Sequence, residues 1–243
     1  MTFTAITTAI LSALAEEQHG LIERLHQPCQ LRRAGRDFWL GNLYGQPVVL
    51  ARSKMGKVAA ATTATALIER FGVRRMVFTG VAGGLGFGVN VGDVVVGRSF
   101  VQHALDVSPL FPRYEVPLYG KARFDVDAAL TAALFDASQM ALADPKLQRA
   151  YPDAKVHTGP IASGDRFVSG AAESSALREA LLAVEMEGAA VAQVCHDYEI
   201  PFAVVRTISD RADDTAHVDF PSFIDQVASK YAQAIIERFL KTL

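Results

Sequence analysis

The sequence predicts a mixed α/β fold in which the whole chain, residues 1–243, forms a single domain. Short apolar runs typical of buried strands alternate along the chain with segments of helical periodicity. A hydrophobic content of 50% and a charged content of 21% supply enough apolar side chains for a large core. We find no internal repeat, low-complexity tract or linker that would divide the chain.

The first third of the chain opens with a strand followed by a helix. Leu21, Ile22 and Leu25 share one face of that helix, and Gly45-Gln46 separates two β-rich runs as in a hairpin. An alanine-rich helical segment then ends near Gly72. The predicted elements are a strand at 5–13, a helix at 16–26, strands at 38–44 and 47–52, a helix at 56–71 and a strand at 76–81.

The rest of the chain continues the alternation of strands and helices. Asp127 is a suitable N-cap for a helix, and Asp144-Pro145 interrupts the helical pattern that follows. Pro221 comes shortly after Asp219 and is predicted in the first turn of a closing helix, where its missing N–H is not needed. The predicted elements are a β-rich stretch at 91–101, an irregular excursion at 105–120, a helix at 127–141, strands at 156–162 and 182–186, a helix at 188–197, a strand at 202–209 and a helix at 221–240.

Composition and charge argue against several classes of function. The formal net charge is −2 and no run of Lys or Arg exceeds two residues, so the chain lacks the positive field that favours nucleic acid or an anionic membrane. No apolar run reaches the roughly 18 residues of a membrane span, and the first residues lack the basic region of a signal peptide. Cys29 and Cys195 form no CxxC pair, which argues against a disulfide scaffold or a zinc site. We expect a cytoplasmic protein with no nucleic-acid or membrane partner.

A glycine-rich stretch from Gly80 to Gly88 follows a predicted strand. Its spacing matches neither nucleotide-binding motif, because the third glycine of GxGxxG and the lysine of a Walker motif would both fall on valine. The stretch therefore predicts a tight turn with positive φ. The same bare backbone would also let a flat ring or a ribose approach closely.

Acidic residues and one arginine lie at the ends of two apolar runs. Glu185 and Glu187 end the first run, and Arg206 and Asp210 lie at the end of the second. Ligands of α/β proteins bind outside the carboxyl ends of strands. Glu185 and Glu187 are two residues apart, so at a strand end their side chains would point to the same side, whereas at a helix start they would interact with the helix dipole. Asp210 is also typical of a turn. A buried guanidinium needs carboxylate partners, so Arg206 among these acids and Glu17 indicates a site.

Other candidate motifs are weaker. His103 and His217 have neither HExxH spacing nor a Cys/His partner, so we expect no metal. Ser163-Gly164-Asp165 is not a GxSxG elbow, because Ile161 stands where the first glycine should be. Taken alone, Phe167 is better explained by core packing than by stacking on a ligand.

Six segments together resemble the nucleoside phosphorylase and nucleosidase superfamily, and most closely the 5′-methylthioadenosine/S-adenosylhomocysteine nucleosidases. They occur in the same order as in that family and span almost the whole chain. The segments are Ser12-Ala13-Leu14-Ala15-Glu16-Glu17, Met55-Gly56-Lys57-Val58-Ala59-Ala60, Thr79-Gly80-Val81-Ala82-Gly83-Gly84, Ser163-Gly164-Asp165-Arg166-Phe167-Val168, Val184-Glu185-Met186-Glu187-Gly188-Ala189 and Arg206-Thr207-Ile208-Ser209-Asp210.

The resemblance implies a twisted mixed sheet with a partly barrel-like core, surrounded by helices. It also implies hydrolysis, without a cofactor, of the bond between adenine N9 and ribose C1′. By resemblance Asp210 is the acid at adenine N7, Glu17 activates the attacking water, and Arg206 orients the water and the acids. The same resemblance assigns substrate contacts to Met55, Val81, Ala82, Gly83, Phe167, Val168, Glu185, Met186, Glu187, Ser209 and Phe220.

Within that set, the resemblance gives six residues more specific roles, among them Met186, which packs against the ribose. Glu187 corresponds to the ligand of the ribose hydroxyls, with Glu185 in its support. Phe167 corresponds to the ring that stacks on adenine, Val168 to the residue whose backbone reads the adenine edge, and Phe220 to the aromatic side chain beside the 5′ substituent. The expected partner is therefore a small-molecule adenine nucleoside.

The resemblance also implies a homodimer in which Val107 and Leu110 of a neighbouring chain close the 5′ pocket. This chain departs from the family at Val81, where serine is frequent. The excursion from Pro109 to Lys121 is also difficult to align, so the identity of the 5′ group is the least constrained inference.

Three alternatives remain open from the sequence. A phosphorylase of the same superfamily would need cationic groups beside the ribose, but this chain has Ala15-Glu16-Glu17 and Phe78 at those places, which favours hydrolysis. A non-catalytic nucleoside sensor could have lost Glu17 or Asp210, and both are present. Hydrolysis of 6-amino-6-deoxyfutalosine, which carries the same adenine and ribose, is the third alternative.

Overall fold

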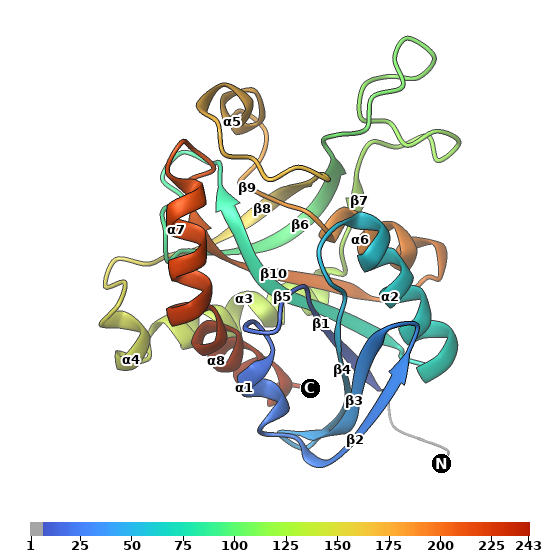
Figure 1. Ribbon diagram of the computed structural model, residues 1–243, viewed down its shortest axis with the longest axis vertical. Helices are drawn as coiled ribbons and strands as arrows, with labels where there is room; N and C mark the ends of the chain where they lie inside the picture. The colour runs from blue at the N-terminus through green and yellow to red at the C-terminus, as the bar shows by residue number, and fades with distance from the viewer. Residues whose placement is uncertain (1–6) are drawn as a thin grey trace.

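The computed structural model describes residues 7–243 and has a mixed α/β architecture with helices on both sides of one sheet (Figure 1). The strands are β1 (Thr8–Ser12), β2 (His26–Arg33), β3 (Arg36–Leu43), β4 (Gln46–Arg52), β5 (Arg75–Gly84), β6 (Val94–Gln102), β7 (Phe124–Asp125), β8 (Val156–Ser163), β9 (Ala183–Glu185) and β10 (Phe202–Asp210). The helices are α1 (His19–Ile22), α2 (Lys57–Phe71), α3 (Ala128–Leu142), α4 (Pro145–Gln148), α5 (Ala171–Arg178), α6 (Gly188–Asp197), α7 (Ala216–Phe223), the π-helical turn η1 (Ile224–Ala228) and α8 (Ser229–Leu240). Within residues 7–243, no helix is long and apolar enough to span a membrane.

Five strands close into a barrel. The order β10-β6-β8-β9-β5 returns to β10, because β10 pairs with β5 as well as with β6. Strands β1, β4, β3 and β2 continue from β5 as an extension of the sheet (Figure 1). The sheet is mixed, since β5 runs parallel to β1 and β10 but antiparallel to β9. The expected twisted mixed sheet with a barrel-like core is therefore confirmed.

Two apolar layers hold the helices against the sheet. Alternate residues of the central strands face opposite layers, so Met76 and Phe78 pack toward α2 and α6, while Val77 packs toward α3 and α8. Burial on both faces explains why the central strands read as continuous apolar runs. The sequence predicted these strands, and it predicted α2, α3 and α6 to within a few residues of their observed bounds.

The local signals behind two helices act as expected. Gly72 ends α2 in the left-handed conformation, with φ of 60°. Asp127 is the N-cap of α3, and its side chain accepts from the N–H of Leu130 at 2.8 Å. The hairpin is also present, although its turn is Tyr44-Gly45, one residue earlier than predicted.

The predicted helix at 16–26 is wrong over most of its length. Only His19–Ile22 is helical, because the Glu17 side chain turns back to the N–H groups of Ala13 and Leu14. Strand β2 begins at His26, and no pattern predicted it because nearly all its side chains are exposed. The predicted strand at 5–13 ends at Ser12, and its residues 5 and 6 lie outside the described part of the chain.

The glycine stretch is mostly strand rather than turn. β5 continues through Gly84, and within this stretch only Gly88 has a positive φ, of 77°. The prediction of a positive-φ turn is therefore wrong for Gly80, Gly83 and Gly84. The lack of a side chain at Gly80 and Gly83 instead leaves room for charged side chains beside the strand.

The C-terminal helical region begins earlier than predicted. α7 starts at Ala216 and contains Pro221 in its interior, so the prediction of Pro221 in a first turn is wrong. Thr215 is the N-cap residue of α7, and just before the helix the Asp213 side chain accepts from the N–H and hydroxyl of Thr215. The π-helical turn η1 follows Pro221, whose ring cannot donate an N–H to the preceding turn. Helix α5 was not predicted.

Candidate active site

A cavity lies where β5, β9 and β10 end and where β1 leads into α1. It collects side chains that are far apart in the sequence but adjacent in the barrel. Its lining is formed by Ala13, Leu14, Glu17, Met55, Val81, Ala82, Gly83, Phe167, Val184, Glu185, Met186, Glu187, Ser209, Asp210 and Phe220. Four of these are carboxylic acids with at most 7% exposure, so the cavity concentrates acidic groups in a low-dielectric place.

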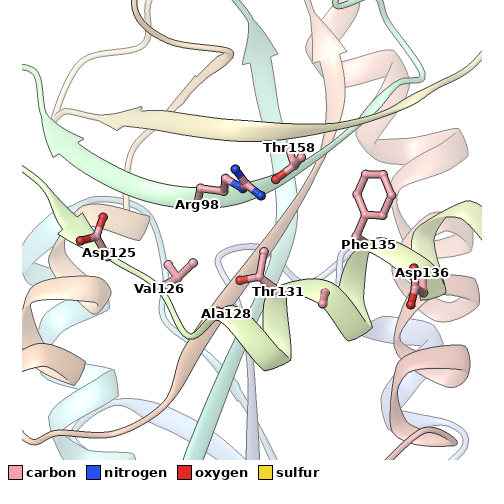
Figure 2. Close-up of a pocket in the computed structure, with 9 residues that line it drawn as sticks. Arg98, Asp125, Val126, Ala128, Thr131, Phe135, Asp136 and Thr158 are labelled. Carbon is pink, nitrogen blue, oxygen red and sulfur yellow. The ribbon is translucent and has the colours of Figure 1, made fainter.

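A larger cleft of about 540 Å³ lies between α3 and strands β6 and β8 (Figure 2). Arg98 and Thr158 extend from the sheet toward the helix that carries Thr131 and Phe135 (Figure 2). None of the predicted site residues lines this cleft. The chemistry implied by the sequence therefore belongs to the smaller, acidic cavity.

Glu17 is held by backbone amides. Its Oε2 accepts from the N–H groups of Ala13 and Leu14, both at 2.8 Å, and its Oε1 accepts from Val81 at 3.0 Å. Burial raises the pKa of Glu17, while these donors and the positive charge of Arg206 act in the opposite direction. The carboxyl is thus fixed in position and suited to gaining a proton during a reaction.

Glu185 is the anchor of Arg206. The Arg206 Nη2 donates to Glu185 Oε2 at 2.7 Å, and both side chains are almost completely buried. The same carboxylate accepts from the Gly188 N–H at 2.8 Å, from the Glu187 N–H at 3.1 Å, and from the hydroxyl of Ser163. Of the four acids that the sequence offered as partners for Arg206, Glu185 is the one in the ion pair.

Glycines in β5 make room for these charges. A Cβ at Gly80 would lie 2.8 Å from Glu17 Oε1 and 2.9 Å from Arg206 Nη1, and a Cβ at Gly83 would lie 2.9 Å from Asp210 Oδ1. The Arg206 guanidinium also stacks over the ring of Phe78, with 4.1 Å from Cζ to the ring centroid. Gly80 therefore allows the close approach of acid and arginine to the strand backbone.

Glu187 diverges from Glu185 because the chain changes direction between them. Glu185 ends β9, whereas Glu187 is the N-cap residue of α6. Its Oε1 accepts from the N–H of Gly56 at 2.7 Å, which leaves the other oxygen of the carboxyl without a protein partner among the described residues. Burial and the nearby charge of Glu185 raise the pKa of Glu187 to about 8.

Asp210 is placed by its own neighbours. Its Oδ1 accepts from the Ala212 N–H and its Oδ2 from the Ser209 hydroxyl, both at 2.8 Å. Burial raises the pKa of Asp210, although these two hydrogen bonds act against the shift. A carboxyl with a raised pKa keeps its proton to a higher pH than an ordinary aspartate does, which suits a general acid.

Aromatic side chains cover the mouth of the cavity. Phe167 and Phe220 contact each other edge to face, with ring centroids 5.6 Å apart, and Phe167 is 41% exposed. The enclosed space beneath them is about 60 Å³, whereas pockets for drug-sized ligands usually hold roughly 300 Å³ or more. The space is therefore smaller than a ligand of nucleoside size needs.

The structure brings the predicted site residues together with few exceptions. All predicted catalytic and substrate-binding residues line the cavity except Arg206, which lies beneath it, and Val168, whose side chain packs in a separate apolar cluster. Val107 and Leu110, predicted to serve a neighbouring chain, do not line it.

Sequence reasoning missed Ala13, Leu14 and Val184 as lining residues. All three fall within or beside the segments that carry the family resemblance, so a signal for them existed. Within residues 7–243 no group of three or more His, Cys, Asp or Glu side chains has an arrangement that could hold a metal ion.

A scan of protein-family models matches residues 7–241 to the family described as the phosphorylase superfamily. The chain is also similar to proteins named 5′-methylthioadenosine/S-adenosylhomocysteine nucleosidase, including those of Bacillus thuringiensis (strain Al Hakam) and Bacillus anthracis. Each is 39% identical over 233 residues, which cover 94% of this chain and 96% of the relative.

The chain is also similar to solved structures over nearly its full length. The nucleosidase of Neisseria meningitidis in complex with methylthio-immucillin-A is 35% identical, with a TM-score of 0.86 and coverage of 98% of this chain and 99% of that chain. The futalosine hydrolase of Helicobacter pylori is 29% identical, with a TM-score of 0.88 and full coverage of both chains. The similarity thus extends over the entire fold and includes all the segments that form the cavity.

Proposed function

Because this chain belongs to the phosphorylase superfamily, we propose that its acidic cavity hydrolyses the N-glycosidic bond of 5′-methylthioadenosine and S-adenosylhomocysteine. The products are adenine and the free 5-substituted ribose. The observation that carries the proposal is the pairing of a fixed carboxyl, Glu17, with a second buried acid, Asp210, across one cavity. Hydrolysis of a nucleoside needs one acid for the leaving base and one group for the water.

In the proposed reaction Asp210 donates its proton to adenine N7 while the C1′–N9 bond breaks and its electron pair moves to the base. Water attacks C1′, forms the new C–O bond and gives its proton to Glu17. Burial supports both roles, since it raises the pKa of each carboxyl and so favours a protonated acid and a more basic carboxylate.

Glu187 and Arg206 complete the proposed set. The Glu187 oxygen that does not face Gly56 would accept hydrogen bonds from the ribose hydroxyls, and its partial negative charge near C1′ would stabilise the oxocarbenium-like transition state. Arg206, fixed by Glu185, has Nε and Nη1 without a hydrogen-bond partner among the described residues. Its Nη1 lies beside Glu17 near Gly80, where it would orient the water.

We assign the adenine to the mouth of the cavity and the 5′ group to its apolar wall. Phe167 would stack on the base, and the backbone of Val168 would read its edge. Phe220, Met55 and Leu14 present the apolar surface that a methylthio group prefers.

Charge placement favours water over phosphate. A phosphorylase needs cationic groups beside the ribose. Among residues 7–243, Arg206 is the only Lys or Arg that is buried, and it is already paired with Glu185. A buried glutamate at the place of attack would repel phosphate and suits activation of water.

Hydrolysis of 6-amino-6-deoxyfutalosine is a second candidate. The full-length similarity to a futalosine hydrolase, with a TM-score of 0.88, supports it. That substrate shares the adenine and the ribose, so the same acids would act on it and only the contacts to the 5′ group would differ.

A homodimer is part of the proposal. Val58 is 81% exposed on α2, Leu110 is also 81% exposed, and Met55 at the cavity mouth is 51% exposed. Burying such apolar side chains against a second copy would lower their exposure to water. A cytoplasmic location, supported by free Cys29 and Cys195, and a place in methionine salvage complete the proposal.

The deciding experiment is a substrate panel with product identification in phosphate-free buffer. We expect free adenine and methylthioribose from 5′-methylthioadenosine. A requirement for phosphate with a sugar 1-phosphate as product would overturn the hydrolytic assignment. A strong preference for aminodeoxyfutalosine would select the second candidate, and light scattering in the same buffer would measure the oligomeric state.

A further inference from the structure

Asp210 lies at an irregular point of β10. The pairing of β10 with β5 shifts its register between Ile208 and Asp210, so that Ser209 is the extra residue of a bulge. Bulges change the direction of a side chain next to a site, and here the change places the Asp210 carboxyl at the cavity. The direction of the Asp210 carboxyl therefore depends on the contacts that hold the backbone just before the bulge.

On the side of β6, that support comes from the turn before the strand. The regular ladder between β10 and β6 ends where Thr207 faces Val94. Beyond it, the Ile208 N–H donates to the carbonyl of Asp93 at 2.8 Å, and the Gly92 N–H donates to the carbonyl of Ile208 at 2.9 Å. Gly92 and Asp93 thus hold the residue that precedes the bulge.

The Asp93 carboxylate holds the turn that contains Gly92 and Asp93. Asp93 is 1% exposed, and its Oδ2 accepts from the N–H of Asn90 at 2.8 Å, while its Oδ1 accepts from the N–H of Lys155 at 2.8 Å. Oδ2 also lies 2.8 Å from Nε2 of His157 on β8. A single buried carboxylate therefore joins the turn to the start of β8.

The turn also abuts the bulge through side chains. Val91 lines a cleft of about 230 Å³ together with Ser209 and Tyr151. Gly92 has φ of 90°, and a Cβ there would clash with the Tyr151 ring. Because the turn is packed this closely, loss of its internal hydrogen bonds would be transmitted to Ser209 and Asp210.

We infer that Asp93 is a positioning residue for the hydrolysis: its carboxylate holds the turn whose backbone fixes Ile208, and this sets the aim of the Asp210 carboxyl. The inference rests on the proposed function, since it takes Asp210 to be the acid that protonates adenine. It adds a residue that touches no substrate and lies on the opposite side of β10 from β5.

The test combines Asp93→Ala and Asp93→Asn with the Asp210→Asn background. We expect Asp93→Ala to lower kcat by about ten- to a hundredfold with KM within about threefold, because the acid is misdirected while the base and ribose contacts remain. Asp93→Asn, which keeps one acceptor for Lys155, should lose less. In the Asp210→Asn background, Asp93→Ala should cause little further loss, since the acid it positions is already absent.

Asp144→Ala is the matched control. Asp144 also accepts a backbone N–H, from Lys146, and it pairs with Arg238, but it lines no part of the active site. Its removal should leave kcat unchanged, with folding of all variants checked by circular dichroism. Should Asp93→Ala not fold, Asp93→Asn and His157→Leu carry the same double-mutant comparison.

Two results would overturn the inference. One is an unchanged kcat in the folded Asp93 variants, and the other is an equal proportional loss with and without the Asp210 carboxyl, which is the result of a merely structural role. A wild-type protein that releases no adenine from any adenine nucleoside would instead reject the proposed function itself.

Discussion

The floor and the rim of the cavity are built in opposite ways. The floor consists of Glu17, Arg206 and Asp210, each at most 3% exposed. The rim is formed by Met55 and Phe167, which are 51% and 41% exposed. The groups proposed for bond breaking thus lie in a buried part of the molecule, whereas those proposed for holding the base and the 5′ group face solvent.

The floor and the rim also differ in the contacts that hold their side chains. Glu17 accepts three backbone hydrogen bonds, and Arg206 is paired with Glu185 at 2.7 Å. Phe167, by comparison, contacts Phe220 edge to face and remains 41% exposed. Under the proposed function, a floor held by backbone amides would keep the reacting groups in one geometry, whereas a rim held by side-chain contacts would accommodate different 5′ groups.

The largest effect is expected when the floor loses its acid. Asp210→Asn should lower kcat by about a hundredfold or more, because an amide cannot give a proton to N7, while adenine binding stays close to wild type. Steady-state kinetics and calorimetry with adenine would measure the two quantities. Near-normal turnover would remove Asp210 from its proposed role and weaken the distinction between floor and rim.

A smaller loss is expected from Gly80→Ala. The added methyl would lie 2.8 Å from Glu17 Oε1 and 2.9 Å from Arg206 Nη1, so one of the two must move, and we expect kcat/KM to fall at least about tenfold. Gly170→Ala is the control, since its Cβ would meet nothing within 4 Å. If both variants are fully active, the floor is less rigid than its hydrogen bonds indicate.

At the rim, Phe167→Ala should act on binding rather than on chemistry. Stacking of a base on an aromatic ring contributes about 1–3 kcal/mol, so KM should rise roughly tenfold with kcat changed much less. Phe87→Ala, which removes a phenyl ring that is 89% exposed and lines none of the cavity, is the control. A fall in kcat alone would mean that Phe167 belongs functionally to the floor.

The last prediction concerns stability and pH rather than turnover. Because the pKa of Glu187 is raised from 4.5 to about 8, the folded protein retains a proton that the unfolded chain releases. Its contribution to the free energy of unfolding is complete below pH 4.5 and is lost as the pH rises toward 8, by at most about 1.4 kcal/mol per pH unit.

Glu187→Gln should therefore flatten the decline of stability between pH 5 and pH 8 in urea unfolding. Glu16→Gln, at an exposed neighbour of Glu17, should not. Parallel curves for wild type and Glu187→Gln would show that this carboxyl is already ionised in the folded protein.

The elements that the sequence predicted well are those whose own residues determine them. β10 and β5 are buried on both faces and read as apolar runs, and Gly72 and Asp127 end or begin helices by local geometry. β2 escaped prediction because its exposed side chains leave no pattern, and the helix at 16–26 was predicted too long because the competing bonds of Glu17 include one to Val81, far along the chain.

The same distinction applies to the site. The acids of the floor were found because charged residues at the ends of apolar runs are unusual, and the family resemblance then separated the roles of Glu185 and Glu187. The function of Gly80 and the support given by Asp93 were not accessible, because both depend on which strands become neighbours when the barrel closes.

The closure of the barrel by β10 has a consequence for how the protein matures. Glu17 follows β1 near the start of the chain, whereas Arg206 and Asp210 belong to β10, which pairs with both β5 and β6. Contacts between segments so far apart in the sequence close a long loop, which slows folding. A nascent chain therefore cannot turn over substrate until its last strand is in place, and catalytic activity reports that the barrel is complete.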